Sequence, residues 1–250
     1  MREPGFLPPL PDYGAEVHVW SVRLDEDAAA LAEFAQLLAE DERERAARLR
    51  FERDRRAFVL ARGALRILLG AYAGEPPAEI AFAYGAAGKP RLASGAPLDF
   101  NVSHSGGFAL FAFARDCELG LDVEAVRPVE RLDEIAERFF CTEERQELRA
   151  LSAAERELAF FRCWTRKEAF IKATGEGLSA PLDRFRVTLR PGEAARLLHV
   201  GGDRGQARAW TMHDLALGTA YAGALAYRKP PLTLRMMPGR SAAALLQRLS

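Results

Sequence analysis

Long apolar runs, an excess of one charge and a cysteine framework are all absent from this chain of 250 residues. No apolar stretch approaches the roughly 20 residues that cross a bilayer, so we expect no membrane partner. The first residues include several prolines and lack the apolar core of a signal peptide, which favours a cytoplasmic protein. Because 49% of the residues are hydrophobic, the chain can bury a substantial core.

The net charge of the chain does not indicate a particular class of binding partner. The 35 basic residues balance 35 acidic ones, so no global field draws the protein toward nucleic acid or anionic membranes. The stretch 42–66 is rich in arginine, which is one feature of nucleic-acid-binding segments. Only Phe51 and Phe58 are available in it for stacking on bases, so a single anionic ligand explains the basic stretch as well. We expect no nucleic-acid partner.

The three cysteines are few, odd in number and far apart: Cys117, Cys141 and Cys163. This spacing fits neither a disulfide framework nor a zinc site. We therefore expect reduced cysteines that are mostly buried as small hydrophobic side chains.

Secondary-structure patterns occur twice in the same order. The first set predicts a strand at 17–22, a helix after an N-cap at Asp25, a helix over about 53–73 and short strands between 80 and 125. Later, a helical pattern follows Thr142, and a capping box of Ser152 and Glu155 begins a helix that runs to about residue 173. The β-like segments that come after it are 185–189, 207–213 and 220–227.

Helices followed by strands, twice, predict an α+β protein of two similar units packed against each other. We expect an N-terminal α+β subdomain over 1–115, a C-terminal α+β subdomain with a metal site over 116–229, and a C-terminal tail over 230–250. No residue-level repeat indicates a duplication. The tail is open to three interpretations, which are a disordered end, a packing segment and a contact for a partner.

Two carboxylates lie two positions apart in the β-like stretch Gly120-Leu121-Asp122-Val123-Glu124. Since side chains alternate along a strand, Asp122 and Glu124 leave the same face and can share one cation. Oxygen ligands of this kind suit magnesium, which takes its other ligands from water and substrate phosphates. Taken alone, such a pair is more often the solvated face of an edge strand.

A second carboxylate motif lies on the helix predicted to end near residue 173. Glu168 and Lys172 are four positions apart and project from one side of that helix. An exposed salt bridge is the simpler interpretation, worth only about 0.3–0.5 kcal/mol. An apolar stripe on the same helix favours a functional interpretation, because a firmly packed helix holds its polar groups in place.

Small hydrogen-bonding groups and two glycines close another predicted strand, at Asn101-Val102-Ser103-His104-Ser105-Gly106-Gly107. This composition is suited to contacts with phosphate, although an ordinary turn has it too. Just before it, Lys89 adds a cation on a loop fixed by proline, where lysines are usually only solvated.

Together, four motifs resemble the signature of the Sfp-type 4'-phosphopantetheinyl transferases: Gly88-Lys89-Pro90, Phe100-Asn101-Val102-Ser103-His104-Ser105, Gly120-Leu121-Asp122-Val123-Glu124 and Trp164-Thr165-Arg166-Lys167-Glu168-Ala169-Phe170-Ile171-Lys172-Ala173. Four motifs in the right order are far more specific than one, and the resemblance covers about residues 17–229. It implies a pseudo-twofold fold of two α+β subdomains with the active site between them, complete in a monomer.

The resemblance also implies an activity, which is transfer of the phosphopantetheine arm of coenzyme A to a serine of an apo acyl or peptidyl carrier protein, with release of 3',5'-ADP. Magnesium would be held by Asp122, Glu124 and Glu168, and the catalytic residues would be Glu168, Lys172 and Asp122. The residues that would contact coenzyme A are Arg45, Arg62, Lys89, Asn101, Ser103, His104 and Lys172. The proton of the incoming serine would pass either to Glu168 or to a water on the metal. Residues 139–144 would lead to the carrier protein, which apolar side chains there would meet.

Two other function classes stay open from the residues alone. A metal-dependent phosphohydrolase would use the same carboxylates and would release 3',5'-ADP from coenzyme A without a carrier. A noncatalytic module would use the arginine-rich stretch to bind DNA or RNA with a steep dependence on salt.

Overall fold

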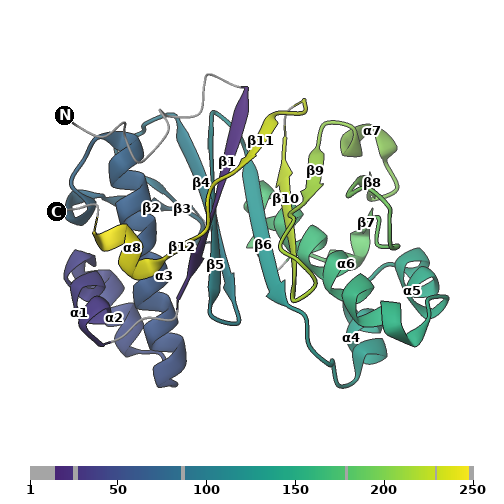
Figure 1. Ribbon diagram of the computed structural model, residues 1–250. Helices are drawn as coiled ribbons and strands as arrows, with labels where there is room; N and C mark the ends of the chain where they lie inside the picture. The colour runs from purple at the N-terminus through teal and green to yellow at the C-terminus, as the bar shows by residue number, and fades with distance from the viewer. Residues whose placement is uncertain (1–14, 25–27, 86–87, 178–179, 229, 248–250) are drawn as a thin grey trace.

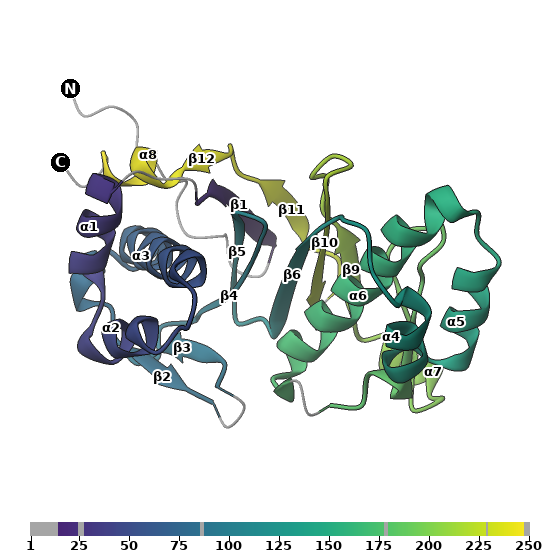
Figure 2. The same cartoon turned by 90° about the horizontal axis from the view of Figure 1, so that it is seen from below.

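The protein folds into four layers, with helices on the two outer sides and two β-sheets between them (Figures 1 and 2). The structure is a computed structural model and describes residues 15–24, 28–85, 88–177, 180–228 and 230–247. One sheet and its helices come mainly from the first half of the chain, and the other sheet and its helices come from the second half. The predicted α+β class with two similar subdomains is confirmed.

The first half begins with a strand, continues through three helices and returns to strands. Its elements are β1 (Glu16–Arg23), α1 (Ala28–Leu37), α2 (Glu40–Ala47), α3 (Glu52–Ala73), the 3-10 turn η1 (Pro77–Glu79), β2 (Phe82–Tyr84), β3 (Pro90–Leu92), β4 (Leu98–Ser105) and β5 (Phe108–Arg115). The main sheet has the order β1-β5-β4 with antiparallel neighbours, and β2 pairs with β3 beside it.

The second half repeats this order. Its elements are β6 (Leu119–Ala125), α4 (Leu132–Phe139), α5 (Thr142–Arg149), α6 (Ala153–Thr174), η3 (Leu182–Arg184), β7 (Phe185–Val187), β8 (Leu197–Val200), α7 (Arg204–Ala207), β9 (Thr211–Asp214) and β10 (Tyr221–Tyr227). Its sheet has the order β6-β10-β9, and β7 pairs with β8. The first strand of each half therefore pairs with the last strand of that half.

A buried ion pair at the same place in each half reveals a repeat that the sequence conceals. Both long helices have 22 residues and end at a glycine with a left-handed φ of 73°, Gly74 after α3 and Gly175 after α6. In the first half, Arg66 of α3 meets the buried Glu42 at 2.7 Å. In the second half, Lys167 of α6 meets the buried Glu144 at 2.8 Å. Arginine in one copy and lysine in the other hide the correspondence from residue matching.

The same two glutamates also begin their helices. Glu42 accepts a hydrogen bond from the Ala39 amide before α2, and Glu144 accepts one from the Cys141 amide before α5. Each carboxylate thus satisfies an otherwise unpaired helix-start amide and a buried cation at once. The short helix of each half is thereby tied to its long helix.

Three apolar clusters hold the layers together. One lies between the first sheet and α1 and α3, and a second lies between the second sheet and α4 to α6. The third joins the two sheets and includes Val19 of β1, Leu110 of β5, Leu121 of β6 and Leu225 of β10. The two halves therefore share a core, which fixes the faces that meet at their junction.

The C-terminal tail is a packing segment in the described residues. It leaves the second half after β10 and crosses to the first, where β11 (Thr233–Met236) and β12 (Arg240–Ser241) run parallel to β1 (Figure 1). Helix α8 (Ala242–Leu246) then adds Ala242 and Leu245 to the apolar cluster of α1 and α3. The tail covers the outer edge of β1, an edge that would otherwise present unpaired backbone groups.

We expect Leu245→Ala to lower the free energy of unfolding by about 2–4 kcal/mol, because Leu245 is fully buried and its truncation leaves a cavity. Urea denaturation measures this change. Gln247→Ala, at an exposed position of the same segment, serves as the control and should leave stability unchanged. Equal stability of the two variants would mean that the tail contributes no packing energy.

Several local expectations differ from the structure. The predicted strand at 207–213 is wrong in its first part, because Asp203 caps the short helix α7 and the strand β9 begins only at Thr211. Helix α4 has a strong apolar face but was not expected from the sequence. The predicted N-cap Asp25 lies outside the described residues.

Cys117, Cys141 and Cys163 are free and buried, as expected. Among the described residues, no helix is long and apolar enough to cross a membrane.

Candidate active site

A glycine lets the main helix of the second half lie directly on the strand that carries the predicted carboxylates. A side chain at Gly120 of β6 would overlap the Ala169 carbonyl and the Ala173 amide of α6. This close approach of helix and strand explains the glycine in the Gly120–Glu124 motif. It also places Glu168 and Lys172 of α6 beside Asp122 of β6.

Lys172 and Asp122 form the centre of this site. The Lys172 ammonium lies 2.6 Å from Asp122 Oδ1 and 3.2 Å from Ser103 Oγ. Asp122 and Glu168 are 4% and 6% exposed, so both carboxylates lie largely out of water. Within the described residues, Asp122 Oδ2 and Glu168 Oε1 are buried oxygens without a hydrogen-bond partner. Unsatisfied buried carboxylate oxygens are costly, which is typical of a site that receives a further ligand.

The carboxylates repel one another. Burial, followed by the charges of Asp122 and Glu124, raises the pKa of Glu168 to about 7. Burial likewise raises the pKa of Glu124, with Asp122 contributing and the hydrogen bond from Ser105 opposing. Negative charges gathered in a buried place attract a cation. No group of three or more His, Cys, Asp or Glu side chains in the described parts of the chain is arranged to hold a metal ion by itself.

Side chains of β4 bond to the free edge of β6 and join the two halves at the site. Asn101 Oδ1 accepts a hydrogen bond from the Leu121 amide, Ser103 Oγ from the Val123 amide and Ser105 Oγ from the Ala125 amide. The two serine hydroxyls donate in turn, Ser103 to Asp122 at 2.8 Å and Ser105 to Glu124 at 2.8 Å. The predicted common face of Asp122 and Glu124 is therefore correct; α6 lies on this face, and β4 runs along the edge of β6.

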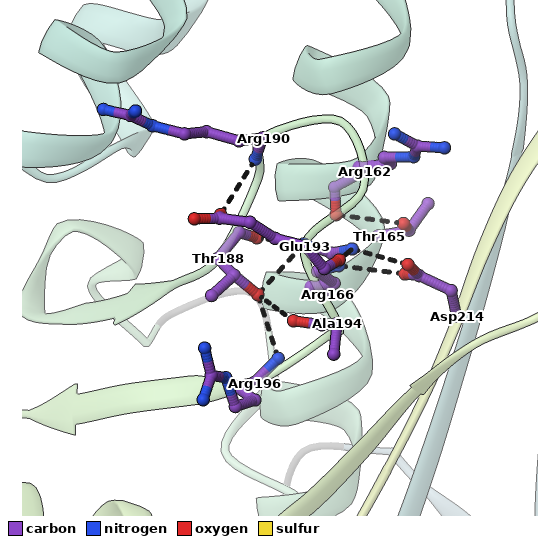
Figure 3. Close-up of polar contacts among 9 residues, drawn as sticks. All are labelled: Arg162, Thr165, Arg166, Thr188, Arg190, Glu193, Ala194, Arg196 and Asp214. Carbon is purple, nitrogen blue, oxygen red and sulfur yellow. Dashed lines mark hydrogen bonds and ion pairs between the residues drawn. The ribbon is translucent and has the colours of Figure 1, made fainter.

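Two further residues of the Trp164–Ala173 motif hold α6 from its other sides, a role that was not predicted. Arg166 is fully buried and donates to both carboxylate oxygens of Asp214 on β9, at 2.9 and 2.6 Å, and to Thr188 (Figure 3). Lys167 donates to the Leu182 and Phe185 carbonyls. Buried cations with several acceptors each hold the helix, and thus Glu168 and Lys172, in a fixed place.

A cavity of about 210 Å³ on the first-half side of β4 brings together most of the predicted coenzyme contacts, because Arg45, Arg62, Asn101 and His104 all line it. His104 also lines a larger cavity of about 1000 Å³ that includes Arg53, Arg56 and Arg127. Ser105, the strand neighbour of His104, lines this larger cavity too, so the basic cavities reach the carboxylate site. Such basic walls suit a ligand with several phosphates.

Like Asn101 and Lys172, the predicted coenzyme contacts Lys89 and Ser103 have partners within the protein. Lys89 donates to the Leu119 carbonyl at 2.7 Å, which adds a fourth side-chain contact along β6, and burial lowers its pKa. The Ser103 hydroxyl donates to Asp122 and accepts from the Val123 amide. Their contact with coenzyme A stays a prediction.

The expected carrier contact by apolar side chains of residues 139–144 is wrong for two of them. Phe140 is 1% exposed and Cys141 is 7% exposed, so both belong to the core of the second half. Phe139 is half-buried and packs edge-on against Trp164. The two phenylalanines appear in the sequence because the end of α4 packs on α6, where their rings meet Trp164 and Phe160.

We expect the metal-free protein to lose stability as the pH rises from about 5 to 8. The pKa of Glu168 is about 7 in the folded state against 4.5 for an ordinary glutamate, so folding favours the protonated form. This contribution is complete below pH 4.5 and is lost as the pH passes 7, with a magnitude on the order of 3 kcal/mol. Urea denaturation at several pH values in the presence of a chelator measures it. Glu168→Gln should flatten this part of the profile, and an identical profile in that variant would contradict the raised pKa.

Comparisons with known proteins cover both halves of the chain. Residues 118–226 match the 4'-phosphopantetheinyl transferase superfamily, and residues 25–115 match the N-terminal region of 4'-phosphopantetheinyl transferases. The chain is 39% identical over 203 residues to the 4'-phosphopantetheinyl transferase HetI of Nostoc sp., covering 80% of this chain and 82% of HetI. It is 33% identical over 156 residues to the 4'-phosphopantetheinyl transferase Sfp of Bacillus subtilis, covering 62% of this chain and 68% of Sfp.

Among solved structures, the holo-[acyl-carrier-protein] synthase of Thermotoga maritima aligns with 45% of this chain and 63% of its own, with a TM-score of 0.35 and 24% identity. The match to HetI, in contrast, covers 80% of this chain, which is more than either half contains. The chain is therefore a member of the 4'-phosphopantetheinyl transferase family.

Proposed function

We propose that this protein transfers the phosphopantetheine arm of coenzyme A to a serine of an apo acyl or peptidyl carrier protein, with magnesium, and acts as a monomer in the cytoplasm. One observation carries the proposal beyond the family assignment: two unsatisfied buried carboxylate oxygens lie beside a lysine and next to basic cavities. A cation and a polyphosphate complete such a site together. Both halves of one chain supply the site, which supports a monomer.

The carboxylates fit magnesium. Asp122, Glu124 and Glu168 would hold it, the first and third with their unsatisfied oxygens. Among the described residues no three such side chains are arranged to hold an ion by themselves, so the ion would need further ligands from water and substrate phosphates. When bound, the ion would neutralise charge on the pyrophosphate of coenzyme A.

Coenzyme A would lie along the junction of the two halves. Arg45 and Arg62 would meet its phosphates in the smaller cavity, with Lys89, Asn101, Ser103 and His104 along β4 and the preceding loop. Lys172 would turn from Asp122 toward the pyrophosphate once a metal ion shares that carboxylate, since its side chain is 29% exposed and able to move.

In the transfer, the serine oxygen of the carrier forms a bond to the β-phosphorus as the bond to the bridging oxygen breaks, and 3',5'-ADP leaves. In this proposal the Glu168 carboxylate, which would also hold the ion, accepts the serine proton. Without the ion, burial raises the pKa of Glu168 to about 7, near the value at which a carboxylate is an efficient base, and a bound cation would lower that pKa. Lys172 supplies positive charge where the leaving pyrophosphate oxygen gains negative charge.

The carrier would approach the lower side of the junction in Figure 1, where β6 ends and α4 follows. A depression of about 420 Å³ begins at Glu124 and continues over apolar side chains that include Val129, Ile135 and Trp164. Amphipathic helices of a partner dock into apolar grooves of this kind. This surface replaces residues 140 and 141 as the expected carrier contact.

The decisive experiment incubates the purified protein with coenzyme A, magnesium and an apo carrier protein and measures the carrier's mass. We expect one phosphopantetheine adduct on the carrier and release of 3',5'-ADP that depends on the carrier. If none of several acyl and peptidyl carriers gains the adduct, the proposal is wrong. Release of 3',5'-ADP at the full rate without a carrier would identify a hydrolase instead.

A further inference from the structure

Ser105 makes two hydrogen bonds at the junction that together fix one carboxylate. Its hydroxyl donates to Glu124 Oε2 at 2.8 Å and accepts from the Ala125 amide at 3.1 Å. The single hydroxyl hydrogen of Ser105 is thus directed at Glu124. The Ala125 amide, on the strand that bears Glu124, donates in turn to the Ser105 hydroxyl oxygen. The contact links β4 of the first half to β6 of the second.

Glu124 needs such support more than Asp122 does. Asp122 is nearly buried and is held by both Lys172 and Ser103. Glu124 is half-buried at the end of β6. Among the described residues, its carboxylate accepts a hydrogen bond from Ser105 alone. A glutamate side chain has three torsions, so without this bond it would sample many orientations.

We propose that Ser105 is a positioning residue that sets the orientation of Glu124 for binding the divalent cation. A hydrogen bond to one oxygen of a ligating carboxylate fixes its plane and leaves the other oxygen for the ion, as outer partners of metal ligands commonly do. The first half of the protein therefore takes part in forming the cation site of the second half. This inference rests on the proposed transfer reaction.

The residue between the two serines has different surroundings. Side chains alternate along β4, so Ser103 and Ser105 face β6. His104, which stands between them in the sequence, lines the smaller cavity. The Ser-His-Ser sequence thus combines two functions: the hydroxyls of Ser103 and Ser105 bond to the carboxylates of β6, and His104 lines both basic cavities, the larger of which Ser105 also reaches.

The test compares Ser105→Ala, which removes the hydroxyl, with Ser105→Thr, which retains it. Removal of an outer partner typically weakens metal binding about 10–100-fold, so we expect the half-saturating magnesium concentration for transfer to rise by about that factor in Ser105→Ala. Calorimetric titration with magnesium alone should show the same weakening without relying on activity. Ser105→Thr should lie near the wild type, and Ser94→Ala, at an exposed serine, should match it.

Unchanged magnesium dependence in Ser105→Ala, with or without a loss of thermal stability, would overturn the inference. Ser105 would then have only a structural role, in joining β4 to β6. An equal shift in Ser105→Ala and Ser105→Thr would also overturn it, because the hydroxyl would then not be the cause. An inactive wild-type protein in the same assay would instead contradict the proposed transfer, so the two failures are distinguishable.

Discussion

Asp122→Asn is expected to lower the rate of phosphopantetheine transfer by at least about 10²-fold. The substitution keeps the shape of the side chain and removes its charge. Asp122 Oδ1 would no longer attract the Lys172 ammonium at 2.6 Å, and the unsatisfied Oδ2 would become part of a neutral amide. Both the cation site and the placement of Lys172 depend on this carboxylate, so the rate should fall at saturating coenzyme A and carrier. Steady-state kinetics on one carrier measures the change.

Asp116→Asn is the matched control for this experiment. Asp116 is an exposed aspartate shortly before β6 and has a left-handed φ of 44°, which asparagine also tolerates. Its transfer rate should equal that of the wild type. Circular dichroism of both variants should show an intact fold, and full activity of Asp122→Asn would remove this residue from the catalytic site.

Strand and helix periodicity were sufficient to predict parts of the site. Alternation placed Asp122 and Glu124 on one face of β6, and the hydrogen bonds from Ser103 and Ser105 to these carboxylates confirm it. The four-residue spacing placed Glu168 and Lys172 on one side of α6, where Lys172 indeed contacts Asp122. Such local rules work because backbone geometry alone determines the direction of each side chain.

What the sequence did not reveal depends on contacts between distant segments. The serines of β4 looked like phosphate ligands because nothing local indicates that β6 presents its free edge to them. No structural role was predicted for Arg166 and Lys167, yet both are fully buried, and their acceptors lie on loops and strands that follow α6. Burial of a charge is decided by tertiary packing, which residue type alone does not predict.

The internal repeat escaped detection for a related reason. Arg66 and Lys167 occupy the same place in their helices, meet corresponding glutamates and donate to corresponding carbonyls. These are Pro77 and Ile80, at the start of η1 and just after it, and Leu182 and Phe185, at the start of η3 and just after it. The physical requirement for a buried cation that ties a helix to the following loop is retained, while the residue that meets it differs. Conservation of an interaction is therefore visible only in three dimensions.

The ion pair of Lys167 supports the largest stability effect that we expect from a single substitution. Lys167→Met should lower the free energy of unfolding by about 3–5 kcal/mol, because it leaves the Glu144 carboxylate buried without its cation. The Leu182 and Phe185 carbonyls would lose their donor at the same time. Urea denaturation monitored by tryptophan fluorescence measures the loss.

The double variant Lys167→Met/Glu144→Gln should recover part of this stability, since the neutral amide removes the uncompensated charge and still has an oxygen to accept from the Val187 amide. Arg48→Met serves as the control, because the pair of Arg48 with Glu44 is mostly exposed and contributes about 0–1 kcal/mol. If Lys167→Met were no more destabilising than Arg48→Met, the buried pair could not be what ties α5 to α6. A double variant less stable than Lys167→Met would mean that the hydrogen bonds of Glu144, and not its charge, dominate its contribution.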